Sequence, residues 1–155
     1  MKNLSYKKWK GLFFEDFLVD DIYEHPFGRT IIESDNTWFS CLTMNTQQLH
    51  YNKDYAEKTE FKVPLVNSCL TLSIITGLSV IDLGYNLIAN LEWNEVKCSA
   101  PVYIGDTLYA KSIILKKQKL KSRSKAGIIE IKTIGNNQDG KIIMEFKRKF
   151  MVKGK

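Results

Sequence analysis

The sequence predicts an α+β fold in which a curved antiparallel sheet packs on one buried helix. The first observation is a mostly apolar segment, residues 63–83, whose scattered polar residues are typical of a buried helix. The second is a second half made of four strand-like runs. The third is that no crossover between these runs is long enough for parallel pairing. No linker, repeat or low-complexity tract divides the chain, so we expect a single domain over residues 1–155.

The central helix is expected to begin at a polar cap, which Asn67 or Ser68 supplies. The apolar positions that follow cover most of the helix circumference, which is more than one short sheet is expected to cover. We therefore expect part of this surface to meet a partner chain. These positions are Leu70, Leu72, Ile74, Ile75, Leu78, Val80 and Ile81. Gly77 weakens a helix by about 1 kcal/mol relative to alanine, so we expect close packing there to compensate.

The four strands are expected over residues 87–96, 107–117, 127–133 and 141–152. In the last run apolar and charged residues alternate, as in a strand that is buried on one face. The apolar set is Met144, Phe146 and Phe150, and the charged set is Glu145, Lys147 and Lys149. Residues 136–140, Asn-Asn-Gln-Asp-Gly, predict a hairpin turn.

The first half of the chain is predicted to consist of loops and short helices. Ser34 is a plausible N-cap for a helix over residues 35–42. Its apolar stripe would be Trp38, Phe39 and Leu42. Asn52 is expected to cap a second short helix through residues 55–56, and a polar loop, residues 45–50, lies between the two helices.

The composition excludes several classes of protein. The net charge of +6 favours the binding of anions, such as a phosphate-bearing ligand. The alternative is that the charge only reflects a lysine-rich, solvated surface. No nucleic-acid motif is present, so no nucleic-acid partner is expected. Three separated cysteines without a CxxC pair predict neither a metal site nor a disulfide, and reduced thiols favour a cytoplasmic location. Residues 1–11 lack the apolar core of a signal peptide, and residues 63–83 are too polar for a membrane span.

The chain has two histidines, His25 and His50. A histidine in a polar loop between two helices is a candidate general base, because its pKa lies near neutrality. His50 occupies such a loop. An isolated histidine is more often a surface residue without a catalytic role, and we apply that interpretation to His25.

The stretch from Phe39 to His50 resembles the MaoC-like (R)-specific hydratase family, whose motif is Gly-Asp-x-Asn-Pro-x-His. The resemblance extends over most of the chain, in the order Phe14–Phe17, Gly28–Thr30, Asn67–Ser68 in place of the family's His-Gly pair, and Pro101–Leu108. It is strongest to the branch of mesaconyl-CoA hydratases, also called β-methylmalyl-CoA dehydratases. This resemblance implies a hot-dog fold, in which the sheet wraps one long helix. It also implies a hydro-lyase acting on an enoyl-CoA thioester without a further cofactor, since coenzyme A is part of the substrate.

The resemblance assigns His50 to the family's catalytic histidine. Asn45 stands where the family has its catalytic aspartate, and Gln47-Gln48 replace Asn-Pro. Asparagine carries no negative charge, so we expect His50 to be the main base and Asn45 to orient water by hydrogen bonding. Asp35 or Glu33 remain alternatives for a carboxylate near the site.

Substrate contacts are expected at three places. The N–H groups that open the central helix near Asn67 and Ser68 suit a developing thioester enolate. Arg123 is a candidate for the phosphates of coenzyme A, or alternatively an exposed charge at a strand end. Asp35 completes the expected ligand contacts.

Two other functions remain open, a hot-dog acyl-CoA thioesterase and a non-catalytic acyl-CoA-binding protein. Sheet edges invite pairing with another chain, and members of the family pair two hot-dog units with coenzyme A between them. We therefore expect a homodimer or larger homo-oligomer.

Overall fold

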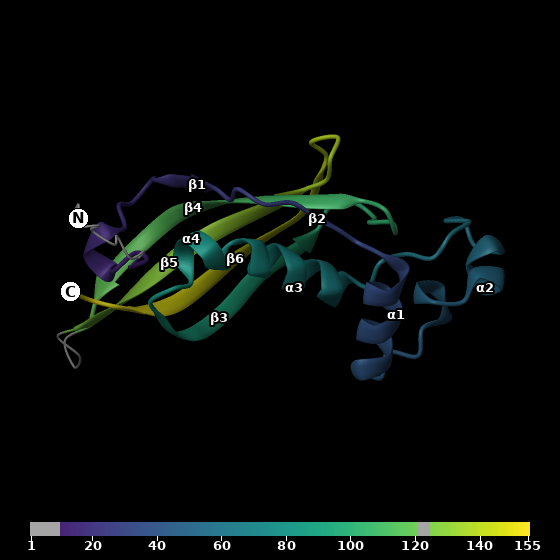
Figure 1. The fold of residues 1–155 in the computed structure, drawn as a ribbon, viewed down its shortest axis with the longest axis horizontal. Coiled ribbons are helices and arrows are strands. Elements are labelled where there is room, and N and C mark those ends of the chain that lie inside the picture. Colours follow the sequence, from purple (N-terminus) through teal and green to yellow (C-terminus); the bar gives the residue numbers. More distant parts are fainter. Residues whose placement is uncertain (1–9, 121–124) are drawn as a thin grey trace, which may run out of the picture.

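The computed structural model describes residues 10–120 and 125–155. Its strands are β1 Ile22–Glu24, β2 Arg29–Thr30, β3 Leu87–Cys98, β4 Thr107–Lys119, β5 Ala126–Asn136 and β6 Ile142–Lys153. Their order in the sheet is β1-β4-β5-β6-β3, with β2 also on β4, and every pair is antiparallel. The four long strands form one curved layer, as Figure 1 shows.

The four predicted strands and their antiparallel pairing are confirmed. Strands β3, β4 and β5 extend beyond the predicted bounds, because regular pairing with a neighbour continues where the sequence pattern fades. The hairpin turn is also found, with a 3.0 Å bond from the Gly140 N–H to the Asn137 carbonyl and Gly140 at a φ of 76°. Strands β1 and β2 were not expected, since two or three residues are too few to show an alternation.

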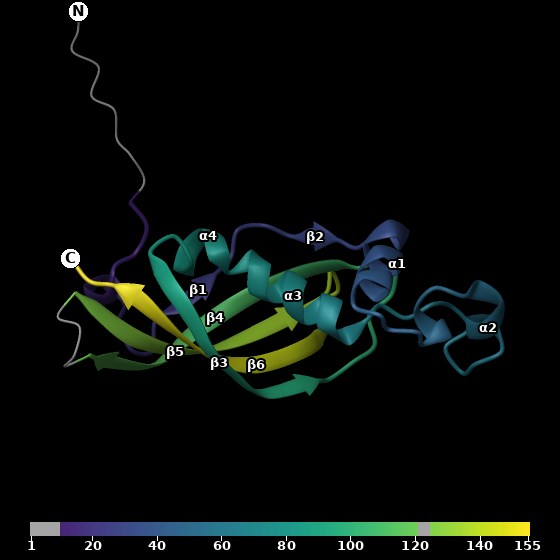
Figure 2. The ribbon, with the colours of Figure 1, turned by 90° about the horizontal axis from the view of Figure 1, so that it is seen from below.

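Helix α3, Ser68–Leu78, packs across the sheet on one face (Figure 2). Asn67 caps it as predicted, because its side-chain oxygen accepts a 2.9 Å bond from the Cys69 N–H. The helix is shorter than the apolar pattern indicated. Ser79 ends it and turns its hydroxyl back onto the Thr76 carbonyl at 2.6 Å, and a separate short helix α4, Val80–Leu83, follows.

The described residues cover only one face of the helix, and the expected covering of its other face stays a prediction about a partner chain. Ile75 is fully buried against the sheet, whereas Ser73 and Gly77 face outward and are exposed. A Cβ added at Gly77 would meet no atom within 4 Å, so the predicted close packing is not found within the chain. The outer face of α3 is therefore uncovered by the described residues.

Helix α1, Glu33–Leu42, begins earlier than predicted and has a different buried face. The Asp35 carboxylate, rather than Ser34, caps it by accepting a 2.9 Å bond from the Ile32 N–H. Trp38 and Leu42 from the predicted apolar stripe are 67% and 77% exposed, whereas Asn36 and Ser40 are fully buried. Together with α2, Lys53–Glu57, this helix lies beyond one end of the sheet, next to the start of α3 (Figures 1 and 2).

Strand β6 shows the predicted alternation, with Phe146 and Phe150 buried on the helix side. Arg148 was not expected on this face, yet it is only 2% exposed. Its Nη2 donates a 2.9 Å bond to the Ser79 hydroxyl, and its guanidinium lies 5.1 Å from the Phe150 ring centroid. Burial lowers the pKa of Arg148 to about 10, so the group stays charged at neutral pH.

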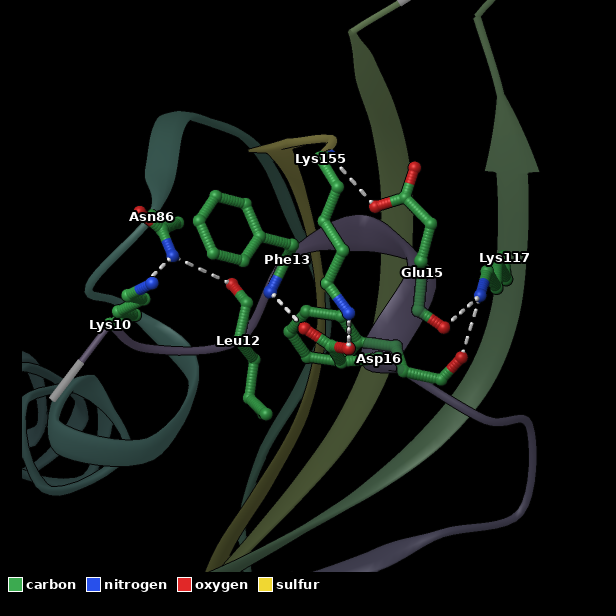
Figure 3. Close-up of polar contacts among 9 residues, drawn as sticks. Lys10, Leu12, Phe13, Glu15, Asp16, Asn86, Lys117 and Lys155 are labelled. Carbon is green, nitrogen blue, oxygen red and sulfur yellow. Dashed lines mark hydrogen bonds and ion pairs between the residues drawn. The ribbon is translucent and has the colours of Figure 1, made fainter.

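The two ends of the described chain are fastened together at the end of the sheet opposite α1, as Figure 3 shows in detail. Here η1, Phe14–Asp16, meets Lys155 and Lys117. The Lys155 N–H donates to the Glu15 carboxylate at 3.0 Å, and the Lys155 ammonium pairs with Asp16. Lys117 donates to the Phe17 carbonyl at 2.8 Å and lies over the Phe14 ring. We call these contacts the terminal clasp.

His25 is buried, which corrects the expectation of a surface residue. Its Nδ1 lies 2.7 Å from the Asp82 carboxylate, and its Nε2 lies 2.9 Å from the Ser112 hydroxyl. Ser112 in turn lies 2.9 Å from the Thr133 hydroxyl. This chain of contacts joins the segment after β1, helix α4 and the sheet.

Candidate functional site

His50 ends a short 3-10 turn, η2, Gln48–His50, in the polar loop after α1. Its Nδ1 lies 3.0 Å from the carbonyl oxygen of Leu65. A carbonyl only accepts, so this bond requires a proton on Nδ1 and leaves the lone pair on Nε2. The ring is half-buried and retains access to solvent. The geometry thus gives His50 the tautomer that a general base needs.

The start of α3 lies only a few residues beyond Leu65. The Asn67 N–H donates to the Asn36 side-chain oxygen at 2.8 Å, so this donor is already used. The Cys69 N–H is used by the Asn67 side chain. The Ser68 N–H opens the first turn, and in the described part of the chain no acceptor pairs with it. Of the two predicted oxyanion donors, the structure therefore leaves the Ser68 N–H available.

Asn45 lies in the loop between α1 and His50. Its N–H donates to the Ser40 carbonyl at 2.9 Å, and its side-chain oxygen accepts a 3.1 Å bond from the Gln47 N–H. This is a side-chain turn of the kind that asparagine and aspartate both form. Within residues 10–120 and 125–155 no hydrogen bond joins Asn45 to His50. The water-orienting role of Asn45 stays a prediction.

Neither alternative carboxylate contacts His50 in the described structure. Both oxygens of Asp35 lie within 2.9 Å of Arg29 Nη2. Glu33 pairs with Lys53 at 3.0 Å on the surface. The two carboxylates hold α1 to its neighbours, and among residues 10–120 and 125–155 no carboxylate is hydrogen-bonded to the His50 ring. Arg123, the candidate for coenzyme A phosphates, lies outside the described residues.

A pocket of about 330 Å³ opens beside the start of α3. Its walls include Phe61, Val66, Ser68, Thr71, Ile143 and Met144. The pocket shares Leu65 and Ser68 with the groups described above, and most of its surface is apolar. An apolar hollow with one free backbone donor at its rim suits an acyl group whose carbonyl oxygen is held at that rim.

The sequence did not point to Asn36, which is fully buried and reaches three backbone groups of the site. The one signal for it was a polar residue one helical turn from Phe39 and Ser40. Asp82, His25 and Ser112 form a second unpredicted set with the order of a hydrolase triad. Ser112 is 0% exposed, so no substrate reaches its hydroxyl, and this set is structural.

The described residues provide neither a metal-binding cluster nor a helix able to cross a membrane. Among the described residues, no cluster of three or more histidine, cysteine or acidic side chains is arranged to hold a metal ion. In residues 10–120 and 125–155 no helix is long and apolar enough to cross a membrane.

A family model described as "MaoC like domain" matches residues 17–137. The β-methylmalyl-CoA dehydratase of Chloroflexus aurantiacus is 31% identical over 97% of this chain, which spans 42% of that protein. The structure of a MaoC domain protein from the same organism superposes with a TM-score of 0.90 and 30% identity, over 97% of this chain and 43% of the other.

A Mycobacterium tuberculosis protein with a double hot-dog fold superposes with a TM-score of 0.83 and 18% identity, over 94% of this chain and 45% of that one. The predicted hot-dog fold is thereby confirmed. The chain spans less than half the length of each of these three proteins.

Proposed function

Because this chain belongs to the MaoC-like domain family, we propose that it is a hydratase or dehydratase that acts on the double bond of an enoyl-CoA thioester. The observation that carries the proposal is the segment from Leu65 to Ser68. Its first carbonyl sets the tautomer of His50, and its last N–H is a free donor at the helix start. One short stretch of backbone thus supports the base and carries the oxyanion donor, and its residues Leu65 and Ser68 line the apolar pocket.

In the hydration direction, Nε2 of His50 takes a proton from water while the water oxygen bonds to the β-carbon. The electron pair of the double bond moves through the α-carbon to the thioester oxygen, which the Ser68 N–H holds. The α-carbon then takes up that proton from Nε2 of His50, which restores the thioester carbonyl and the neutral imidazole. Asn45 is proposed to orient the attacking water through its side-chain amide.

The substrate is proposed to be mesaconyl-CoA or β-methylmalyl-CoA, on the strength of the named Chloroflexus relative. Coenzyme A enters as part of the substrate, and no other cofactor is required by these steps. The proposed location is the cytoplasm, which agrees with three exposed and unpaired cysteines.

The proposed assembly is a homodimer. Within the described part of the chain, strand β3 has an open edge with exposed Leu91, Trp93 and Val96, and the outer face of α3 is uncovered. The double hot-dog fold of the Mycobacterium tuberculosis protein supports the idea that a second hot-dog unit covers these surfaces.

The direct test is to incubate the purified chain with mesaconyl-CoA, crotonyl-CoA and longer enoyl-CoAs. Loss of enoyl absorbance without release of free thiol is expected. Release of thiol would identify a thioesterase. The absence of both signals, with retained binding, would identify a non-catalytic acyl-CoA-binding protein.

A further inference from the structure

The side chain of Asn36 joins both halves of the proposed site. It lies on α1, is 0% exposed, and contacts two separate stretches of backbone. Its Nδ2 donates to the His50 carbonyl at 2.7 Å and to the Leu65 carbonyl at 2.9 Å. Its Oδ1 accepts from the Asn67 N–H at 2.8 Å. Every polar group of this amide therefore serves the loop of the base or the segment that opens α3.

The chemistry of the amide fits this position and no charged side chain does. An asparagine offers two N–H donors and one acceptor oxygen on a short stem, without charge. An aspartate of the same size would keep the acceptor but would place a negative group against two carbonyl oxygens. Because the site is buried, a carbonyl oxygen without a donor, or one facing a carboxylate, would lower the free energy of unfolding.

The carbonyl oxygen of Leu65 is the hydrogen-bond acceptor that Asn36 and His50 share. This oxygen has two lone pairs and accepts from both Asn36 Nδ2 and His50 Nδ1. With Asn36 in place, that oxygen is fixed in direction, and so is the imidazole that donates to it. Asn36 also occupies the Asn67 N–H and leaves the Ser68 N–H as the donor at the pocket rim.

We propose that Asn36 is a positioning residue that fixes the tautomer of His50 and its placement relative to the Ser68 N–H. This inference rests on the proposed hydratase function for its kinetic consequence only. Asn36 touches no substrate; it acts through Leu65 and Asn67. Loss of its donors frees the Leu65 carbonyl to turn, and the His50 ring turns with it.

The test compares Asn36→Asp with a matched control, Asn86→Asp. Asn86 is also buried and also donates through Nδ2 to two carbonyls, those of Lys10 and Leu12, at 2.6 and 3.2 Å. It lies beside the terminal clasp, as Figure 3 shows, and the clasp is at the end of the sheet opposite α1. Both substitutions remove the two N–H donors of the side-chain amide, so both should lower the free energy of unfolding. Only Asn36→Asp should disturb His50.

Two readouts are measured on the full chain. Steady-state hydration of an enoyl-CoA gives kcat and KM separately over pH, and nitrogen NMR of labelled histidine gives the tautomer of each ring. Only two histidines need assignment, and a His50→Gln variant identifies the signals. The wild type should show the Nδ1–H tautomer at His50. Asn36→Asp should mix the tautomers and lower kcat by about 10- to 100-fold with little change in KM, because a small misplacement of a catalytic group has effects of this size.

A wild-type His50 in the Nε2–H form would overturn the inference without any variant. So would an Asn36→Asp protein with the wild-type tautomer and a kcat within twofold of that of Asn86→Asp. If Asn36→Asp does not fold, Asn36→Ser, which is uncharged and smaller, replaces it with the same expected results. If the wild type hydrates no enoyl-CoA, the proposed function fails, and the NMR readout still decides the role of Asn36.

Discussion

The Nδ1 atom of His50 donates a 3.0 Å hydrogen bond to the carbonyl oxygen of Leu65, which leaves the lone pair of the ring on Nε2. His50→Ala removes this base and should lower kcat for enoyl-CoA hydration by about 10²- to 10⁴-fold. Steady-state kinetics measure the effect, and circular dichroism checks that the fold is retained. A folded His50→Ala protein with near-normal turnover would show that another group activates water.

Asn45 is expected to contribute by hydrogen bonding alone. Asn45→Ala loses the turn with Gln47 and the proposed hydrogen bond to the attacking water, so kcat should fall. Asn45→Asp keeps the acceptor that the turn requires and should retain substantial activity with a displaced pH–rate profile, because the new carboxylate titrates. The comparison is made from full pH–rate profiles of all three proteins. If Asn45→Ala follows the wild-type profile throughout, Asn45 has no part in the reaction.

The buried His25 is expected to affect stability and leave catalysis unchanged. His25→Ala leaves Ser112 and its partner Thr133 without the imidazole and opens a cavity between α4 and the sheet. The free energy of unfolding should fall by about 1–3 kcal/mol or more. Urea denaturation measures this loss, and kcat measured well below the transition should stay near wild type. A large fall in kcat in the folded variant would give His25 a catalytic role after all.

The terminal clasp should weaken in acid. Hydrogen bonds from the backbone N–H of Lys155 lower the pKa of Glu15, and the ammonium of Lys155 lowers the pKa of Asp16. A carboxyl whose pKa is lowered by folding stabilises the folded state at any pH above its ordinary pKa, which is 4.5 for Glu15 and 3.8 for Asp16. This stabilisation is lost as the pH falls through the pKa of the folded state. The melting temperature of the wild type should therefore drop toward low pH.

The double variant Glu15→Gln with Asp16→Asn lacks the titrating groups and should show a smaller drop between pH 6 and about pH 3. Glu57→Gln, at an exposed position on α2, serves as the control and should follow the wild type. Parallel curves for the double variant and the wild type would show that the clasp does not contribute to acid stability.

The uncovered face of α3 gives a test of the proposed dimer. A Cβ added at Gly77 would meet no atom of the described residues within 4 Å, so Gly77→Trp should fold as a single chain but collide with a second copy on that face. Native mass spectrometry should find a wild type of two 17.9 kDa chains and a monomeric variant. Glu57→Trp is the control for an added surface tryptophan. A dimeric Gly77→Trp protein would place the interface elsewhere.

The four long strands and two of the three helix caps could be predicted from the sequence because their signals are local. Alternation along β6 and the caps Asn52 and Asn67 depend on neighbours a few positions away, and all three are found in the structure. The short strand β1 could not be predicted, since it exists only through pairing with β4 much later in the chain. Pairing at such separation leaves no periodic trace in three residues.

The orientation of α1 was predicted wrongly for a related reason. A hydrophobic stripe predicts the face that meets an apolar core. Of the predicted stripe only Phe39 packs against the core. Helix α1 also packs against a loop whose backbone carbonyls need donors, so Asn36 is buried and Trp38 is exposed. The partners of Asn36 are 14, 29 and 31 residues away, beyond the range of any local pattern. His50 could be proposed from the sequence because its loop and the family motif coincide.

The pairing of β3 has a consequence for the nascent chain. Within the described sheet β3 pairs only with β6, so that Leu87 lies opposite Val152. During synthesis β3 leaves the ribosome well before its partner strand exists, and both its edges stay unpaired for that interval. Pairings between strands so far apart in sequence form slowly, and open apolar edges invite aggregation. Glu92 and Glu95 on β3 place charge between its apolar residues, and charges at such positions lower the tendency of an unpaired strand to aggregate.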